Sequence, residues 1–266
     1  MKIDILGVKI DNLNYFDTLK KIELIIDSNL KEYIVTANPE ILLEALNNLK
    51  YLNILNKAKL VTADGIGIIW AAKFLSLKSK SYFKSIIQII YTGILLLIYP
   101  KYFAKFIPER ITGIDLMDKL CKFSEKKKYN IYLLGGEAGI AQKTKVELLI
   151  KYPNLSIVGY EIGPDEKTVE NINRVRANIL FVAFGAPKQE LWIDQNLNNL
   201  NINLAIGVGG AFDFVSGQVK RAPRIYQDLN LEWFYRLIKE PWRAIRIFNA
   251  TFKFIYYLTK FKHQFN

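Results

Sequence analysis

The feature that most constrains the fold is a repeated unit in which a short apolar run is followed by a helical pattern. Several runs are apolar at consecutive positions, as in IYLL, ILFVAF and LAIGVG, which is typical of strands covered on both faces. Strands that alternate with helices predict a mostly parallel sheet flanked by helices, so we expect an α/β fold. The expected strands are residues 3–8, 33–37, 60–62, 130–135, 156–160, 179–184 and 203–208.

Helical patterns fill the intervals between these runs and continue to the end of the chain. Pro39 and Pro187 stand where a first helical turn tolerates a missing N–H, and Pro241 separates the last two helices. We expect a body of residues 1–217 and a basic helical C-terminal appendage of residues 218–266. The expected helices are residues 14–28, 39–47, 66–75, 113–127, 138–151, 166–175, 188–197, 226–239 and 242–260.

The positive charge is concentrated in two segments. The chain has a formal net charge of +12. Residues 73–110 hold seven Lys or Arg against one acid, and residues 217–266 hold ten against three. Both segments are also rich in aromatic and aliphatic residues. Basic and apolar character together favour an anionic membrane surface over a nucleic acid as the partner. The alternative, an ordinary basic surface over core aromatics, stays open.

One apolar segment, residues 86–99 (IIQIIYTGILLLIY), is the best candidate for contact with a membrane. It is shorter than the ~20 residues that a helix needs to cross the hydrocarbon core, and it contains Gln88 and Gly93. It is interpreted as a buried helix, an interfacial segment or a re-entrant one. The first apolar run contains acidic residues, so we expect no secretory signal and a cytoplasmic protein.

The residue inventory excludes several kinds of chemistry. Cys121 is the single cysteine and His263 the single histidine, three positions before the last residue. An internal disulfide and a Cys/His zinc site are therefore excluded, and a Ser-His-Asp triad would need the tail. No D-x-D string occurs, so the usual metal clamp for a sugar nucleotide is not evident. We expect no metal and no cofactor, and catalysis by carboxylates, hydroxyls, amides and guanidiniums.

Polar and glycine-rich strings follow five of the expected strands. Because the carboxyl ends of parallel strands meet at one sheet edge, these strings predict one site for a phosphate-bearing ligand. None of them completes G-x-G-x-x-G and none carries a Walker lysine, and glycines as turn formers remain the alternative for each string. The strings are TANPE (36–40), ADGIG (63–67), GGEAG (135–139), GAPKQE (185–190) and GVGGAFD (207–213).

Asp64 is the best candidate for a general base. It directly follows an apolar strand at the start of a helix, where burial raises a carboxyl pKa. The alternative is an N-cap, and both roles can hold. Thr36 and Asn38 offer hydroxyl and amide contacts or a capping turn. For Glu190, a favourable interaction with the helix dipole is the plain explanation.

Arginines are available to bind a diphosphate. Arg110 follows the basic apolar segment. The tail holds Arg221, Arg224, Arg236, Arg243 and Arg246. The alternative for the tail arginines is a solvated helix face.

Taken in order, the strings TANPE, ADGIGIIWAA, ERITGIDLM, YLLGG, FGAPKQE, GVGGAFD, KRAP and LEWFYRLIKEPWR resemble the WecG/TagA/CpsF family of bacterial glycosyltransferases. The resemblance covers nearly the whole chain. It implies a Rossmann-like, metal-independent, inverting transferase. Such an enzyme moves a hexose or hexosamine derivative from UDP to a polyprenyl-diphosphate-linked sugar at the cytoplasmic membrane face. TagA members make the ManNAc–GlcNAc linkage unit of wall teichoic acid, which gives ManNAc and GlcNAc as the best-guess sugars.

The resemblance also assigns roles to residues. Asp64 looks like the base that deprotonates the acceptor hydroxyl. The appendage resembles the family's membrane-associating tail. Contacts to the donor or its sugar are implied for Thr36, Asn38, Gly136, Gln189 and Asp213, and contacts to the diphosphate for Arg110, Arg236, Arg243 and Arg246.

The chain departs from the family pattern at residues 78–108, where members usually have a much shorter connection. Two other functions compete with the transferase. One is a non-catalytic nucleotide-sugar-binding relative at a membrane surface. The other is a dinucleotide-dependent oxidoreductase, against which the missing fingerprint weighs. The identity of the donated sugar and the number of associating chains, including a homo-oligomer, are left open.

Overall fold

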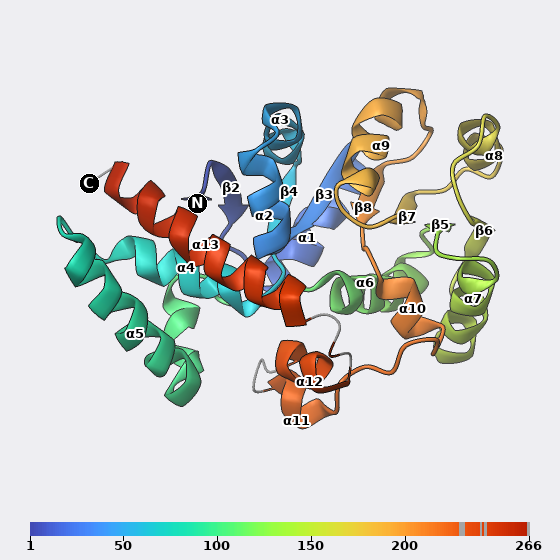
Figure 1. The fold of residues 1–266 in the computed structure, drawn as a ribbon. Helices are drawn as coiled ribbons and strands as arrows, with labels where there is room; N and C mark the ends of the chain where they lie inside the picture. The colour runs from blue at the N-terminus through green and yellow to red at the C-terminus, as the bar shows by residue number, and fades with distance from the viewer. Residues whose placement is uncertain (229–231, 240, 242–243, 265–266) are drawn as a thin grey trace.

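Six parallel strands form the central sheet of the protein, seen in a computed structural model that describes residues 1–228, 232–239, 241 and 244–264 (Figure 1). Their order across the sheet is β4-β3-β8-β7-β5-β6, which confirms the expected α/β fold. The strands are β3 (Glu32–Ala37), β4 (Leu60–Ala63), β5 (Ile131–Gly135), β6 (Ile157–Glu161), β7 (Ile179–Ala183) and β8 (Leu204–Gly207).

Helices cover both faces of this sheet. Successive side chains of each strand point to opposite faces, so the apolar runs contribute to a buried cluster on each face. In β7, Leu180 and Val182 belong to one buried cluster, whereas Ile179 and Phe181 belong to the other. The first cluster includes side chains of α2 (Pro39–Leu46), α3 (Leu49–Lys57), α4 (Ile66–Ser76), α8 (Thr168–Arg174) and α9 (Lys188–Asn196). The second includes α1 (Tyr15–Asp27), α6 (Gly113–Lys127), α7 (Ile140–Lys151) and α10 (Ala211–Val215). A short 3-10 turn, η2 (Leu197–Asn199), follows α9.

Residues 3–8 do not form the single strand that we expected. They belong to a separate antiparallel hairpin of β1 (Lys2–Ile5) and β2 (Val8–Asp11). The two turn residues, Leu6 and Gly7, have φ values of 55° and 84°, as a tight hairpin turn requires. Leucine is rare at such a position, which is why the turn was not predicted from the sequence. The hairpin is tied to β4, since the Asp11 carboxylate accepts a hydrogen bond from Val61 N at 2.9 Å.

The C-terminal region is helical, but its described residues form three helices where we expected two. They are α11 (Arg224–Asp228), α12 (Glu232–Lys239) and α13 (Ala244–Gln264). Helix α13 packs on α2 and α4 and buries Phe254 and Leu258 in the core of the body. Helices α11 and α12 lie together below the body in Figure 1.

The apolar segment 86–99 lies within α5 (Tyr82–Ile98), which is followed by the 3-10 turn η1 (Pro100–Lys105). The interpretation as a buried helix is wrong, since only Ser85 and Thr92 of α5 are buried. In the part of the chain that the structure describes, no helix has both the length and the hydropathy to cross a bilayer.

Candidate active site

Asp64 lies at the carboxyl end of β4, beside the neighbouring strand β3. Its backbone N–H donates to Ala37 O at 2.8 Å, which continues the strand pairing by one residue. The N-cap of α4 is Gly65, whose φ of 127° suits glycine, so the N-cap interpretation of Asp64 is wrong. Instead, the Asp64 carboxylate accepts a hydrogen bond at 3.3 Å from Gly113 N, in the first turn of α6.

The Asp64 carboxyl has a pKa suited to proton transfer. Burial raises its pKa from the ordinary 3.8 to about 6. The Gly113 N–H and the Arg110 guanidinium oppose this rise, and the nearby carboxylates of Glu232 and Asp115 add to it. A carboxylate with a pKa near 6 is ionised at neutral pH and still basic enough to accept a proton.

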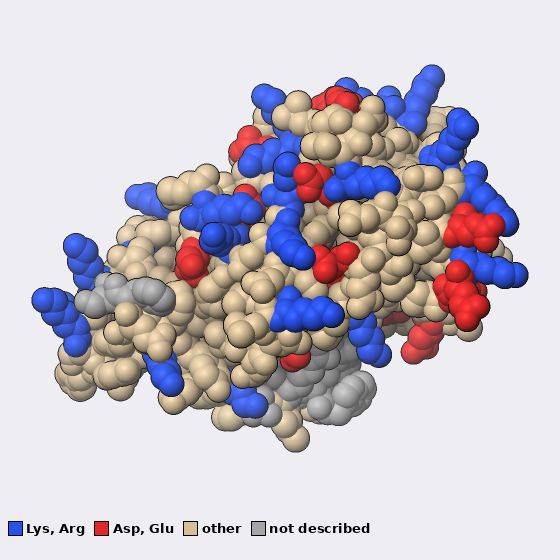
Figure 2. Space-filling view, turned by 90° about the horizontal axis from the view of Figure 1, so that it is seen from above, with Lys and Arg blue, Asp and Glu red and all other residues tan. Residues whose placement is uncertain are grey.

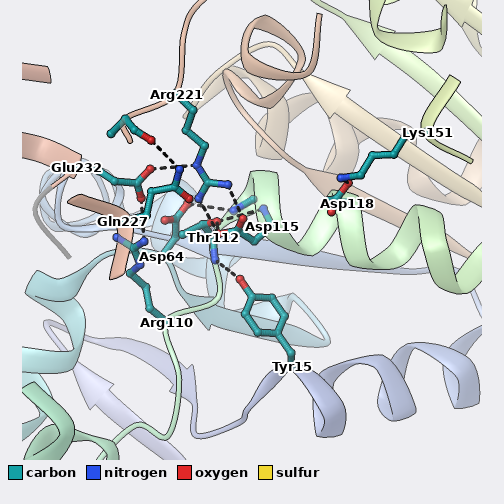
Figure 3. A network of polar contacts seen from close by, with 12 residues as sticks. Tyr15, Asp64, Arg110, Thr112, Asp115, Asp118, Lys151, Arg221, Gln227 and Glu232 are labelled. Carbon is teal, nitrogen blue, oxygen red and sulfur yellow. Dashed lines mark hydrogen bonds and ion pairs between the residues drawn. The ribbon is translucent and has the colours of Figure 1, made fainter. Parts of the chain in front are cut away.

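Next to Asp64, a chain of alternating charges links the body to the C-terminal helices (Figure 3). Arg221 makes a two-pronged contact with Asp115 of α6, at 2.5 Å and 2.8 Å. Arg221 Nε also donates to Glu232 Oε1 of α12 at 3.0 Å. The other oxygen of Glu232 accepts from Arg110 Nη2 at 2.7 Å. One carboxylate therefore lies between two guanidiniums, which is the arrangement that a phosphate group prefers.

The start of α6 holds this chain of charges in place. Thr112 is the N-cap of α6, and its Oγ1 accepts from Asp115 N at 3.1 Å and donates to Asp115 Oδ2 at 2.7 Å. Burial by itself would raise the pKa of Asp115, but hydrogen bonds from Arg221 and Thr112 hold it below its ordinary value. The Tyr15 hydroxyl accepts from Thr112 N at 3.2 Å. Sequence reasoning missed Glu232, Asp115 and Tyr15 as parts of this site.

Thr36 and Asn38 lie beside Asp64, at the end of β3. The buried Thr36 hydroxyl donates to Gly207 O of β8 at 3.1 Å. Asn38 is the N-cap of α2, and its side chain accepts from Ile41 N at 3.0 Å, which confirms the capping role that we had weighed. Their positions also bring these two side chains to the carboxyl edge of the sheet.

Gln189 is buried and bonded within the protein. Its Oε1 accepts from Gly209 N at 2.9 Å, and its Nε2 donates to Glu190 Oε1 at 2.7 Å. Glu190 is fully buried and also accepts from Tyr51 Oη at 3.0 Å, so it does more than complement a helix dipole. A Cβ at Gly207 would lie 2.6 Å from Gln189 Nε2, so this packing requires glycine. Gln189 thus supports the loop between β8 and α10.

Gly136 and Asp213 lie on the other half of the sheet. Gly136 follows β5, where an added Cβ would lie 3.0 Å from Ile140 and 3.7 Å from the ring of Phe212. Asp213 is in α10, where a Cβ at Gly210 would lie 3.4 Å from its carboxylate. The site residues therefore form two groups, one around Asp64 and one around α10. The end of β8 lies between them.

The structure does not describe the side chains of the three tail arginines that the resemblance assigned to the diphosphate. Arg243 lies outside the described residues, as do the side chains of Arg236 on α12 and Arg246 on α13. Arg221, which the structure brings into the site, belongs to the KRAP string and lies 106 positions from its partner Asp115. Arg221 was counted among the available tail arginines from the sequence, but the resemblance did not assign it to the diphosphate.

Two further observations bear on the location of the site. A hollow of about 670 Å³ between α3 and α9 is lined by Lys50, Asn53, Ile54, Asn56, Lys57 and Asp194. It lies towards the amino ends of the strands and contains none of the strand-end strings. Among the described residues, no group of three His, Cys, Asp or Glu side chains could hold a metal ion.

The amino-acid sequence can now be compared with those of known proteins. The model of the Glycosyl transferase WecG/TagA/CpsF family matches residues 3–90 and 81–265. The two matched segments overlap at residues 81–90, which include the first half of α5. The N-acetylglucosaminyldiphosphoundecaprenol N-acetyl-beta-D-mannosaminyltransferases of Staphylococcus aureus strains MW2 and NCTC 8325 are each 31% identical to this chain over 268 residues. The match covers 99% of this chain and 94% of each relative. The resemblance seen in the sequence strings is thereby confirmed, and the chain belongs to the WecG/TagA/CpsF family of glycosyl transferases.

Proposed function

We propose that this protein transfers N-acetylmannosamine from UDP to the GlcNAc of a diphosphoundecaprenol acceptor. The single observation that carries the proposal is the position of Asp64, a carboxyl with a pKa of about 6, next to two arginines that share one carboxylate. The activity for which the relatives are named supports the choice of sugars and acceptor, since these relatives align with nearly the whole chain.

In the proposed reaction, Asp64 removes the proton from an acceptor hydroxyl as that oxygen attacks the anomeric carbon of the donor sugar. The bond between the anomeric carbon and the donor phosphate breaks, and its electron pair leaves with UDP. The proton stays on Asp64 and is later released to water. Attack from the face opposite the leaving group inverts the anomeric centre.

The leaving diphosphate needs positive charge as the bond breaks, and no metal is required if arginines supply it. Arg110 and Arg221 already hold the Glu232 carboxylate at 2.7 Å and 3.0 Å. A phosphate oxygen in place of that carboxylate would meet the same donors. We assign Arg110 and Arg221 to the diphosphate and retain Arg236, Arg243 and Arg246 as further candidates.

We also propose how the chain is organised around this reaction. Residues 1–217 form the catalytic body, and residues 218–266 form the arginine-rich appendage that closes the site over the substrates. The bonds from Arg221 to Asp115 and from Glu232 to Arg110 support this closure. Because the acceptor is lipid-linked, we propose a peripheral location on the inner face of the cell membrane, at an anionic surface. Self-association remains a prediction to be tested.

The competing function is a nucleotide-sugar-binding relative without catalysis. Such a protein has no need for a half-buried carboxyl with a raised pKa beside two arginines that could bind a phosphate. The position of Asp64 therefore favours the enzyme.

A transfer assay with a short-chain GlcNAc-diphosphate-lipid and a panel of UDP-sugars tests the proposal. We expect transfer from UDP-ManNAc, and a loss of roughly 100-fold or more in turnover for Asp64→Asn with nearly unchanged UDP binding. Asp118→Asn is the matched control, since Asp118 lies on the same helix as Asp115 but pairs with Lys151 away from the site (Figure 3). Turnover of Asp64→Asn within threefold of wild type would refute the assignment of the base.

A further inference from the structure

Helix α5 turns three uncharged polar side chains, those of Ser85, Gln88 and Thr92, towards the protein. Most of its apolar side chains are exposed, although Ile89, Leu95 and Leu96 pack against the core. Its two buried residues, Ser85 and Thr92, are both polar. Thr92 Oγ1 accepts from Trp70 Nε1 of α4 at 2.9 Å. Gln88, between them on the same helical face, accepts from Lys262 Nζ at 2.7 Å. A helix on the surface of a water-soluble protein normally shows the opposite arrangement.

The outward face of α5 is large and continuous. Nine aliphatic or aromatic side chains of the helix are more than half exposed, and they recur along its whole length. Single exposed apolar residues are ordinary, but a contiguous patch of this kind marks an interaction surface. The nine residues are Tyr82, Phe83, Ile86, Ile87, Ile90, Tyr91, Ile94, Leu97 and Ile98.

Helix α13 anchors α5 to the body and carries a second apolar row. The His263 ring stacks on Tyr82 with centroids 4.1 Å apart, and its Nε2 lies 3.0 Å from Ser85 Oγ. Four exposed side chains of α13 recur at spacings of three and four residues, which puts them on one helical face. They are Ile245, Phe248, Phe252 and Tyr256.

The charges around α5 identify what covers it. No acidic residue occurs from residue 65 to residue 108. Exposed lysines flank both ends of the helix, at positions 78, 80, 84, 101 and 105. In Figure 2, the end of the molecule where α5 and α13 lie is a broad uncharged surface with Lys and Arg around it. An apolar face bordered by lysines complements an anionic lipid surface, in which acyl chains lie beneath negative headgroups.

The length of α5 decides how it lies in the lipid. Its 17 residues make a helix of about 25 Å, shorter than the about 30 Å hydrocarbon core. Because lysines flank both ends, both ends belong at the headgroups. The helix therefore lies along the surface.

We infer that α5 is a membrane-docking helix that lies in the interface of an anionic bilayer with its apolar face among the acyl chains. The inference rests on the proposed function in one respect, since a lipid-linked acceptor puts the substrate in a membrane. It adds the element that makes the contact, within the segment where the chain departs from the family pattern.

Substitutions on the exposed face test the inference without disturbing the core. In the full chain, Phe83, Ile90, Ile94 and Leu97 would be replaced together by Gln. The matched control replaces Phe16, Leu49, Ile150 and Ile162 by Gln, which are exposed apolar residues elsewhere on the molecule. Binding is measured by sedimentation with vesicles of phosphatidylcholine alone or with 30% phosphatidylglycerol.

We expect the α5 variant to bind anionic vesicles at least tenfold more weakly than wild type, and the control variant to bind within twofold of wild type. Binding of wild type should fall with added salt and on neutral vesicles. Asp64→Asn should bind vesicles like wild type, and the α5 variant should still transfer sugar to a short-chain acceptor without vesicles. These two results separate failure of the docking inference from failure of the proposed function.

Unchanged vesicle binding by a folded α5 variant would overturn the inference. So would an oligomer of the wild-type chain that the α5 substitutions dissociate while vesicle binding persists, measured by sedimentation velocity. In that case a second copy of the chain, and not lipid, would cover the helix.

Discussion

Replacing Asp64 with Asn is expected to make the folded protein more stable at neutral pH, although it removes the proposed base. The ionised carboxylate is held in a site where burial disfavours its charge. Asparagine has nearly the same shape, and its Oδ1 can still accept the hydrogen bond from Gly113 N. The substitution therefore removes the charge with little change in packing.

The size of the effect follows from the pKa. The shift from 3.8 to about 6 corresponds to about 3 kcal/mol, at about 1.36 kcal/mol per pKa unit, as an upper limit. Since the residue is partly exposed to solvent, we expect a gain of about 1–2 kcal/mol in the free energy of unfolding at pH 7.5.

The sign depends on pH in a defined way. Below about pH 4, Asp64 is protonated in both the folded and the unfolded chain, so its charge costs nothing. As pH rises from about 4 to about 6, the unfolded chain loses the proton first, and wild type loses stability relative to the variant. At pH 5.0 about half of the difference should be present, and above about pH 6.5 nearly all of it.

Urea unfolding of wild type, Asp64→Asn and Asp118→Asn at pH 5.0 and 7.5 measures this difference. Asp118→Asn removes an exposed carboxylate of α6 that pairs with Lys151, and it should show no such gain. The reasoning would be refuted if Asp64→Asn were less stable than wild type at pH 7.5. An equal gain at both pH values would refute it as well.

Three further predictions concern the ligands and the appendage. Glu232→Gln removes the carboxylate that competes with phosphate for Arg110 and Arg221, so calorimetry should show inorganic pyrophosphate binding several-fold more tightly; weaker binding would contradict this. EDTA should leave the transfer rate unchanged, and a rate that only Mg²⁺ or Mn²⁺ restores would reopen the search for carboxylate ligands. A chain that ends after Gly217 should still bind UDP but transfer no sugar to the lipid acceptor; because α13 buries Phe254 and Leu258 against the body, its melting temperature should also fall. Loss of all cooperative unfolding in that chain would mean that residues 1–217 do not fold without the appendage, contrary to this prediction.

Much of the fold follows from local pattern. The run at residues 179–184 is apolar at consecutive positions, and β7 is buried on both faces of a parallel sheet as that pattern predicts. Asn38 before Pro39 predicts a helix start, and the side chain does cap α2. The hairpin at the N-terminus was missed because Leu6 stands at a turn position where Asn, Asp or Gly is usual, although Gly7 fits the turn.

The candidate site likewise follows partly from the sequence and partly from the tertiary structure alone. The sequence determined that Asp64 stands at a strand end, because parallel strands bring their carboxyl ends to one edge. Only the tertiary structure decided that Gly113 and not the α4 N-terminus binds its carboxylate, and that Glu232 lies between Arg110 and Arg221. Arg110 and Glu232 are 122 positions apart, and no local periodicity encodes such a contact.

The orientation of α5 shows most clearly what the sequence left undecided. Composition indicates an apolar helix with basic flanks, and it is compatible with a buried helix as well as with an exposed one. The hydrogen bonds that fix the orientation of α5 come from distant parts of the chain. Trp70 donates to Thr92, and Lys262 donates to Gln88. Because these distant partners hydrogen-bond the polar side chains of Thr92 and Gln88, the helix turns them inward and leaves most of its apolar side chains exposed.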